Sequence, residues 1–221
     1  VLIILIRIAD TAVMNASGAI GGAVSISGVE TAVVGGQVNA AGYSGAGGAI
    51  DATAETLTIG STASLDASGL TTGGTIRAGG GYQGNDIEIL NATTTTVEEG
   101  ALLIADGAED DGGNVFLWAD GDTFFGGEIS AQAKGLNGNG GFVEVSGKDK
   151  LSFRGTVSTL SANGLNGTLL LDPTDVVIGT VGTAGITISD LDLVSALVTN
   201  NVVVHTASPG GDPGDITVLF G

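Results

Sequence analysis

Short apolar runs with an alternating pattern follow glycines that recur along the chain. In each run the inward positions lie two and four residues after the glycine, with a different residue between them. Such period-two alternation is typical of a strand with one buried face. The glycines are Gly22, Gly48, Gly74, Gly113, Gly141 and Gly167. The inward pairs are Val24/Ile26, Ile50/Ala52, Ile76/Ala78, Val115/Leu117, Val143/Val145 and Leu169/Leu171.

The spacing of these glycines indicates a repeat. Successive glycines are 26 residues apart, except for one step of 39 residues and one of 28. The longest step carries an insertion of 13 residues, which we place at about residues 79–95. We expect the repeated glycine to form a corner, through a positive φ angle or through tight geometry. Lys148 follows the pair Gly140 and Gly141, but no helix pattern comes next, so we do not expect a phosphate-binding loop.

Two further strands are expected in each unit. The second has inward pairs at Ala32/Val34, Leu57/Ile59, Thr95/Val97, Thr123/Phe125 and Leu151/Phe153. The third has them at Met14/Ala16, Val38/Ala40, Leu65/Ala67, Leu103/Ala105, Ile129/Ala131 and Val157/Thr159. A glycine closes the third strand at Gly18, Gly42, Gly69, Gly107, Gly135 and Gly164. A unit this small cannot close its own core, so its inward residues must stack on those of the next unit. The sequence therefore predicts an all-β fold, a parallel β-solenoid with three strands per coil of about 26 residues.

The chain beyond residue 179 departs from the repeat. Between Ser189 and Thr199, apolar residues recur at helical spacing, and Ser189 or Asp190 can cap the first turn. These apolar residues are Leu191, Val194, Leu197 and Val198. We expect solenoid repeats over residues 1–179, and a continuation or covering segment over residues 180–221. That segment would contain a short helix at 189–199 and strands near 201–207 and 216–220, joined by a loop.

Composition excludes several classes of function. The net charge is −18, with only six Lys and Arg, so the basic surface that nucleic acid requires is missing. The same charge disfavours contact with an anionic membrane surface. The chain has no cysteine, which rules out disulfides and thiolate metal sites. The apolar start, residues 1–10, is too short to span a bilayer, and we interpret it as part of a longer chain.

Few residues offer chemistry. The single histidine, His205, has no second histidine or cysteine near it, so we expect neither a zinc site nor a catalytic triad. Residues 79–86 are similar to a calcium-binding glycine repeat, but they occur once and with altered spacing. The acidic segments 108–113 and 171–175 offer oxygen ligands for Ca²⁺, although solvated turns are the simpler interpretation. We therefore expect no cofactor, with Ca²⁺ as the alternative.

An enzyme of the polysaccharide lyase or hydrolase type needs clustered carboxylates or an Arg base in a groove. The outward column of the first strands holds no row of acids, so we expect no enzyme. This column is Ser25, Asp51, Arg77, Phe116, Glu144 and Leu170. Within it, Arg77 is expected to pair with Asp51 and to lie over Phe116.

Three aromatic residues form the candidate ligand site. The predicted register points Phe116 and Trp118 outward, with Phe124 outward on the next strand. Exposed apolar side chains that gather together often mark contact sites. The alternative is that the insertion packs over these aromatic side chains, which would make them a packing patch.

Four segments of the chain resemble the C-terminal repeat region of filamentous-haemagglutinin-like adhesins, which are two-partner-secretion exoproteins of Gram-negative bacteria. The segments are GGTIRAGGGYQGND, GGNVFLWADGDTFFGGEISAQ, GNGGFVEVSGKDKLSFRGTVST and GLNGTLLLDPTDVVIG, within residues 73–179. The resemblance implies a right-handed parallel β-helix, export through an outer-membrane β-barrel transporter, and adhesion at the outer cell surface. It brings no catalytic residues. We expect the family's secretion domain, which contacts the transporter, to lie outside this chain.

The expected function is that of a structural stalk or display segment of a large secreted adhesin that mediates attachment to cells or surfaces. Its partners would be neighbouring coils of a longer chain and an unknown ligand on a host cell, a neighbouring cell or another surface. Two alternatives stay open: a subunit that self-associates into a surface filament or sheath, and a module that itself binds a glycan or protein.

Overall fold

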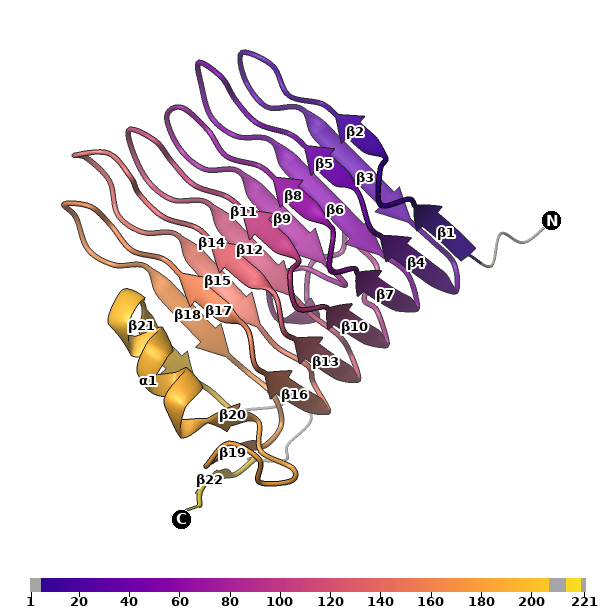
Figure 1. The fold of residues 1–221 in the computed structure, drawn as a ribbon, viewed down its shortest axis with the longest axis vertical. Helices are drawn as coiled ribbons and strands as arrows, with labels where there is room; N and C mark the ends of the chain where they lie inside the picture. The colour runs from indigo at the N-terminus through magenta and orange to yellow at the C-terminus, as the bar shows by residue number, and fades with distance from the viewer. Residues whose placement is uncertain (1–4, 207–213, 220–221) are drawn as a thin grey trace.

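The repeat folds into stacked coils of three short strands each. The computed structural model describes residues 5–206 and 214–219. The strands pair in parallel, coil on coil, in three sheets that surround one core (Figure 1). The fold is therefore a parallel β-helix, and the parallel strands bring residues of the same unit position into register.

Each sheet contains one strand position of the unit. Sheet 1 comprises β3 (Ala23–Ser27), β6 (Ala49–Thr53), β9 (Thr75–Ala78), β12 (Asn114–Leu117), β15 (Phe142–Val145), β18 (Thr168–Leu171) and β21 (Asn201–Val204). Sheet 2 comprises β1 (Leu5–Ile8), β4 (Thr31–Val34), β7 (Thr56–Ile59), β10 (Thr94–Val97), β13 (Asp122–Phe125), β16 (Lys150–Phe153), β20 (Ile188–Ser189), β19 (Val176–Gly179) and β22 (Ile216–Val218). Sheet 3 comprises β2 (Val13–Asn15), β5 (Gln37–Asn39), β8 (Ser64–Asp66), β11 (Leu102–Ile104), β14 (Glu128–Ser130) and β17 (Thr156–Ser158).

The predicted inward residues form continuous columns. In sheet 1 the column Val24, Ile50, Ile76, Val115, Val143 and Leu169 is in register from coil to coil. Each of these side chains is at most 8% exposed. Burial of one large aliphatic side chain contributes roughly 1.5–3 kcal/mol, so the columns are the main source of stability. Thr95 and Thr123, which are also fully buried, donate hydrogen bonds to the carbonyls of Trp118 and Ser146 at 2.7 and 2.8 Å.

The repeated glycines are required because the coils approach closely. None of the six has a positive φ angle, so left-handed geometry is not the reason. A Cβ atom on Gly48, Gly74, Gly113, Gly141 or Gly167 would instead lie 1.9–2.1 Å from a carbonyl oxygen of the preceding coil. Each glycine N–H also donates to the carbonyl at the end of its own third strand, as Gly141 does to Ala131 at 2.8 Å.

Two details of the repeat differ from the predictions. The ladder of isolated bridges that follows sheet 3 runs through Gly18, Gly42, Gly69 and Gly107, and then through Ala133 and Ser161. The prediction of Gly135 and Gly164 at these positions was wrong, because the bridge always falls three residues after the strand ends. The Ser161 side chain supplies the local turn itself, since its hydroxyl accepts a hydrogen bond from the Gly164 N–H at 2.6 Å.

The C-terminal segment adds one helix at the end of sheet 3. α1 (Asp190–Thr199) is capped by Ser189, whose side-chain oxygen accepts from the Asp192 N–H at 3.0 Å. The helix packs against β17 through Ala196, and the Asn200 amide donates to the Val157 carbonyl at 2.8 Å. This side chain therefore bonds β17, which is the last strand of sheet 3 in the described part of the chain.

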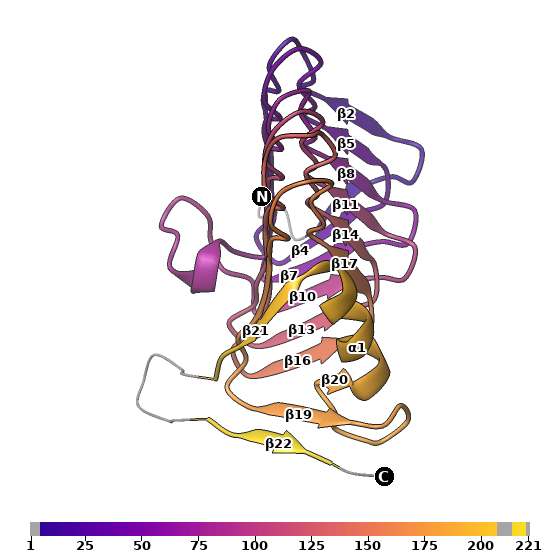
Figure 2. The same ribbon diagram turned by 90° about the vertical axis from the view of Figure 1, so that its left-hand side faces the viewer.

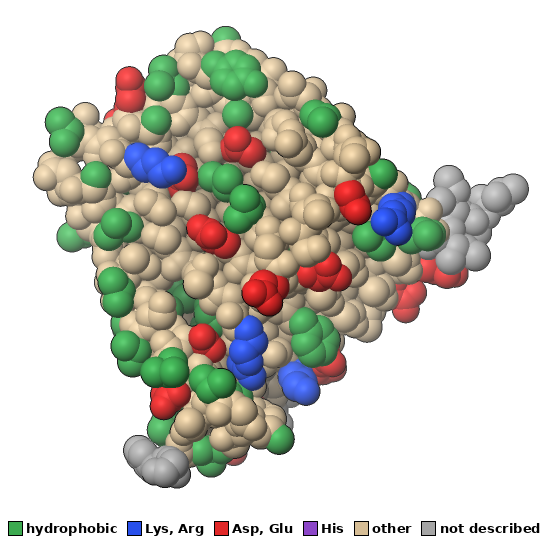
Figure 3. Space-filling model, viewed as in Figure 1, with side chains coloured by type: hydrophobic (Ala, Val, Ile, Leu, Met, Phe, Trp, Pro, Cys, Tyr) green, Lys and Arg blue, Asp and Glu red, His purple; other side chains and the backbone are tan. Residues whose placement is uncertain are grey.

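The apolar residues that predicted α1 do not face the core. Leu191, Val194, Leu197 and Val198 are each at least 56% exposed. In Figure 3 hydrophobic side chains gather over α1 at the lower left. The strands expected after the helix are β21 and β22, whereas most of the loop expected at 208–215 lies outside the described residues.

Candidate functional site

The insertion folds over the outer face of sheet 1. It runs from Gly79 to Thr93, between β9 and β10, and is called the strap below. Figure 2 shows it as the magenta loop that projects from the side of the coils. It contains a single 3-10 turn, η1 (Tyr82–Gly84), and begins with positive φ angles at Gly79 and Gly80. The strap therefore interrupts an otherwise regular side of the β-helix.

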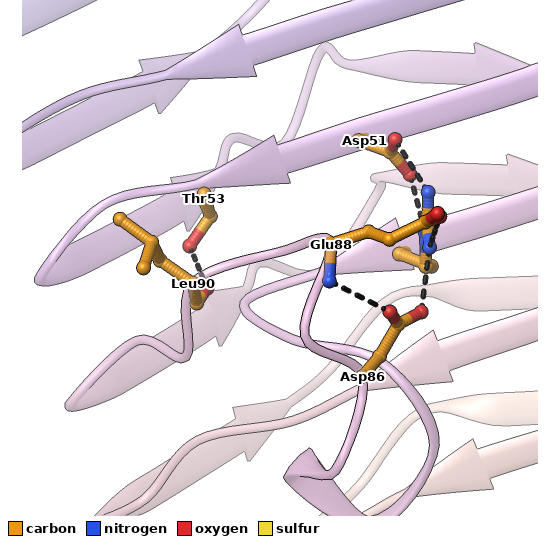
Figure 4. A network of polar contacts seen from close by, with 6 residues as sticks. Asp51, Thr53, Asp86, Glu88 and Leu90 are labelled. Carbon is orange, nitrogen blue, oxygen red and sulfur yellow. Dashed lines mark hydrogen bonds and ion pairs between the residues drawn. The ribbon is translucent and has the colours of Figure 1, made fainter.

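An ion-pair cluster holds the strap to the coils on its N-terminal side. Arg77 donates to Asp51 through Nε and Nη2 at 2.7 and 2.8 Å, and to Asp86 of the strap through Nη1 at 2.5 Å. Glu88 lies 3.6 Å from the same Nη1 atom, and Figure 4 shows the three acids converging. The Glu88 N–H and the Arg77 guanidinium lower the pKa of Asp86. The predicted pairing of Arg77 with Asp51 is thus confirmed, and Asp86 joins it.

A second contact ties the strap further along the same side. The Thr53 hydroxyl, on β6, donates to the Leu90 carbonyl at 2.6 Å, as Figure 4 also shows. Asn91 donates through its side-chain amide to the Gly84 carbonyl and to Asp120, at 2.9 and 3.0 Å. These bonds fix the returning half of the strap, so its path is set at both ends.

Aromatic side chains pack beneath the strap. The Tyr82 ring lies edge-on to Phe116 and Phe142, with ring centroids 6.1 and 5.7 Å apart. Trp118 is only 5% exposed, and Gly84 lies so close that a Cβ there would be 2.5 Å from the indole. The indole N–H donates to Asp120 at 2.9 Å. Trp118 is therefore covered by the strap.

The third aromatic residue of the predicted patch lies elsewhere. Phe124 belongs to β13 of sheet 2 and is 39% exposed. Among the described residues, the ring contacts under the strap join Tyr82, Phe116 and Phe142, and do not include Phe124. The structure thus covers two of the three predicted residues and separates the third from them.

The tip of the strap ends on two buried carboxylates. Gln83 adopts a left-handed backbone conformation, with φ of 51°, which is uncommon for a residue other than glycine. Its N–H donates to Glu144 Oε2 at 2.9 Å, and its side-chain amide donates to Asp172 at 2.8 Å. The strap therefore reaches from β6, where Thr53 lies, to the residue that follows β18.

Glu144 is the most perturbed acid of this group. It is fully buried, and burial raises its pKa to about 7, although the hydrogen bonds from Gln83 and Ser146 act in the opposite direction. The nearby charge of Asp172 raises the pKa further. Oε1 of Glu144 has no hydrogen-bond partner in the described part of the chain. Alternation correctly placed Glu144 and Leu170 in the outward column, but both are buried there, at 0% and 6% exposure.

His205 lies beside this pair of acids. Its Nδ1 atom is 2.9 Å from Asp172 Oδ1, and the His205 side chain is about half exposed. The backbone N–H of Asp172 donates to the Ser146 hydroxyl oxygen at 3.1 Å. Ser146, Asp172 and His205 each follow a strand of sheet 1 at the equivalent position. The serine contacts the aspartate and not the histidine, which is not the order that a nucleophilic triad needs.

The acidic segments weighed as calcium ligands make protein contacts. Asp86 is bound by Arg77, Asp111 accepts from the Asn139 N–H at 2.7 Å, and Asp175 accepts from the Asp215 N–H at 2.9 Å. Within residues 5–206 and 214–219, no group of three or more His, Cys, Asp or Glu side chains has the geometry to hold a metal ion. No helix in this part of the chain is long and apolar enough to cross a membrane.

One solved structure similar to this fold is the HMW1 secretion domain from Haemophilus influenzae, with a TM-score of 0.52 and 26% sequence identity. The match covers 73% of this chain and 46% of that chain, so this chain spans about half of its length. No model of a known protein family and no curated protein sequence matches the chain. The structural neighbour supports in part the resemblance to two-partner-secretion exoproteins. It is itself a secretion domain, whereas we expected that domain to lie outside this chain.

Proposed function

We propose that this chain is a stiff display segment of a secreted, adhesin-related exoprotein at the outer surface of a Gram-negative cell. The observation that carries the proposal is the unbroken register of inward residues from coil to coil, in a fold similar to a secretion domain. A stack of this kind resists bending, because each coil shares its backbone ladder and its core with the next.

The strap supports this mechanical role. Its contacts extend from Thr53 on β6 to Asp172 after β18, so one loop braces several successive coils. The best candidates for chemistry, Glu144 and Asp172, are buried beneath it. We accordingly propose no enzymatic role, and a screen for cleavage of acidic polysaccharides tests this part.

A deletion in phase with the repeat tests the display role. Removing residues 25–50 takes out 26 residues, which is one register step, and joins Val24 to Asp51. In the full-length protein on cells, we expect secretion, folding and attachment to persist, because a spacer works with one coil fewer. Removing residues 25–49 is the matched control. It shifts the following strand by one residue, turns its apolar side chains outward and should abolish folding.

The result that contradicts the display role is specific. If the deletion of residues 25–50 leaves a folded, secreted protein that no longer attaches, the coil itself binds the ligand. The isolated fragment would then bind the same surface directly, and a pull-down would detect this binding.

The structural neighbour favours a second candidate function, participation in export. A reporter fused to this chain would be exported through a two-partner transporter if the chain itself engages that transporter. A display segment alone would leave the reporter inside the cell. Export that depends on the transporter would therefore place a secretion signal in this chain.

A further inference from the structure

The strap and two neighbouring corners enclose a groove of about 950 Å³. Strap residues 84–91 form one wall, and the corners at 27–29 and 54–55 form the other. Ala54 and Ile89 line it and are buried, at 4% and 7% exposure. Ile87 and Leu90 also line it, but they are 100% and 73% exposed. The groove therefore offers apolar contacts at its base and along its open side.

All the ionisable side chains that line the groove are acids. Asp86 shares the single positive charge of Arg77 with Asp51 and Glu88. Among the described residues, Asp120 accepts only from the uncharged donors of Trp118 and Asn91. Glu55 is exposed and has no side-chain partner among the described residues. Two uncompensated negative charges thus flank an apolar surface.

The groove is held open by contacts that are already made. Hydrogen bonds at Gln83, Asp86, Leu90 and Asn91 fix the strap just before and within residues 84–91. A site whose wall is already ordered loses little free energy to ordering when a ligand binds. Its volume lies within the usual range for a binding pocket.

We propose that this groove binds an extended segment of another protein in which Lys or Arg alternates with aliphatic residues. The cations would pair with Glu55 and Asp120, while the aliphatic side chains would pack on Ile87, Leu90 and Ala54. Anionic partners such as nucleic acid or an acidic lipid surface are repelled by the same two carboxylates. No aromatic ring lines the described groove, so it lacks the stacking surface that sugars use.

The probe is a fluorescent eight-residue peptide of alternating Lys and Leu, and its binding is measured by fluorescence anisotropy. Two peptides of equal length serve as references, one of alternating Lys and Ser and one of alternating Glu and Leu. We expect the Lys–Leu peptide to bind about ten-fold more tightly than the Lys–Ser peptide, because burial of one Leu accounts for that factor. The Glu–Leu peptide should not bind.

Matched variants locate the site. Glu55→Lys should weaken binding of the Lys–Leu peptide about five-fold, and Glu109→Lys, which changes the net charge equally at an exposed residue far along the chain, should leave it within two-fold. Leu90→Asp should weaken binding about ten-fold, whereas Leu136→Asp, at a residue 79% exposed on another loop, should not. Circular dichroism checks that each variant keeps its strands.

Two results overturn the proposal. If Glu109→Lys weakens binding as much as Glu55→Lys does, the peptide responds to the overall charge and not to the groove. If the Lys–Ser peptide binds as tightly as the Lys–Leu peptide, the apolar surface has no part in recognition. Should Leu90→Asp fail to fold, Ile87→Asp replaces it, because Ile87 is fully exposed.

Discussion

Replacing Glu144 by Gln tests how the strap is held at its tip. Burial raises the pKa of Glu144 from 4.5 to about 7, with a further contribution from Asp172 and opposition from the Gln83 and Ser146 hydrogen bonds. At about 1.4 kcal/mol per pKa unit, this difference corresponds to about 3 kcal/mol of unfolding free energy. The carboxylate therefore destabilises the folded chain whenever it is charged.

The direction in which stability changes with pH follows from the pKa values of Glu144 in the folded and in the unfolded chain. The folded state binds the proton more tightly than the unfolded state, whose pKa is close to 4.5. Below that pH the proton is bound in both states, and burial of the carboxyl group carries no charge penalty. Stability is lost as the pH rises from about 4.5 through 7, and the full cost of about 3 kcal/mol is present above it.

The assay is urea unfolding of the wild type and Glu144→Gln at several pH values. We expect the two proteins to be about equally stable at acid pH, and the Gln variant to be more stable by up to about 3 kcal/mol at alkaline pH. The two proteins differ in this one side chain, so the difference between their unfolding free energies isolates Glu144. Glu99→Gln, the same substitution at an exposed site, is the control. A difference that stays constant with pH would refute the reasoning, because the pKa of Glu144 would then be the same in the folded and the unfolded chain.

Three further substitutions and one control substitution test the packing. Gly141→Ala should lower the unfolding free energy by about 3 kcal/mol in thermal unfolding, because its Cβ would lie 1.9 Å from the Gly113 carbonyl oxygen. The control Gly60→Ala should lower it by under about 1 kcal/mol, because the nearest atom lies 3.4 Å from its Cβ. Trp118→Ala should cost about 3–5 kcal/mol and speed hydrogen exchange in the strap, whereas lost adhesion with unchanged melting would indicate a ligand site. Phe124→Ala should change stability by about 1 kcal/mol or less, and an adhesion assay shows whether its exposed ring binds a ligand.

The sequence contained enough information to place the coils. Period-two alternation sets which side chains point inward, and the glycine spacing sets how far apart equivalent strands are. Both are local patterns, and the observed register steps of 26, 39 and 28 residues reproduce the glycine spacing. The physical role of the glycines was left open, and it is decided by contacts between coils, since a Cβ on Gly141 would meet the Gly113 carbonyl oxygen.

The candidate site was less accessible to sequence reasoning. Alternation points Glu144 outward, where a carboxylate is ordinarily solvated. It is buried because Gln83, which is 61 residues earlier, folds over it. The path of an insertion that occurs once has no repeat to reveal it. The 13-residue insertion and the glycines at 79–81 and 84 do indicate a loop in the sequence. They do not indicate which face of the coils this loop covers.

For helix α1, too, the sequence predicted the position of the element but not its orientation. Its position followed from capping chemistry at Ser189 and from apolar spacing, which are local. Its orientation did not, because Ala196 and Leu193 pack toward the core, while the residues that predicted the helix stay exposed. Asn200 explains the choice, since its side chain bonds the Val157 carbonyl and the Thr159 N–H and so fixes the helix end against the last strand of sheet 3.

A repeating fold limits where specific recognition can develop. Coils that share the same turns and inward columns present similar outer ladders, so a ligand that fits one coil would fit the next almost as well. Only a break in the period creates a surface that occurs once, and here the break is the strap. It brings Arg77, Gln83 and the acids beneath it into contacts that no other described coil repeats. A chain whose regular part supplies length and stiffness would therefore locate its selective binding at the strap, and variants of the strap should separate attachment from folding.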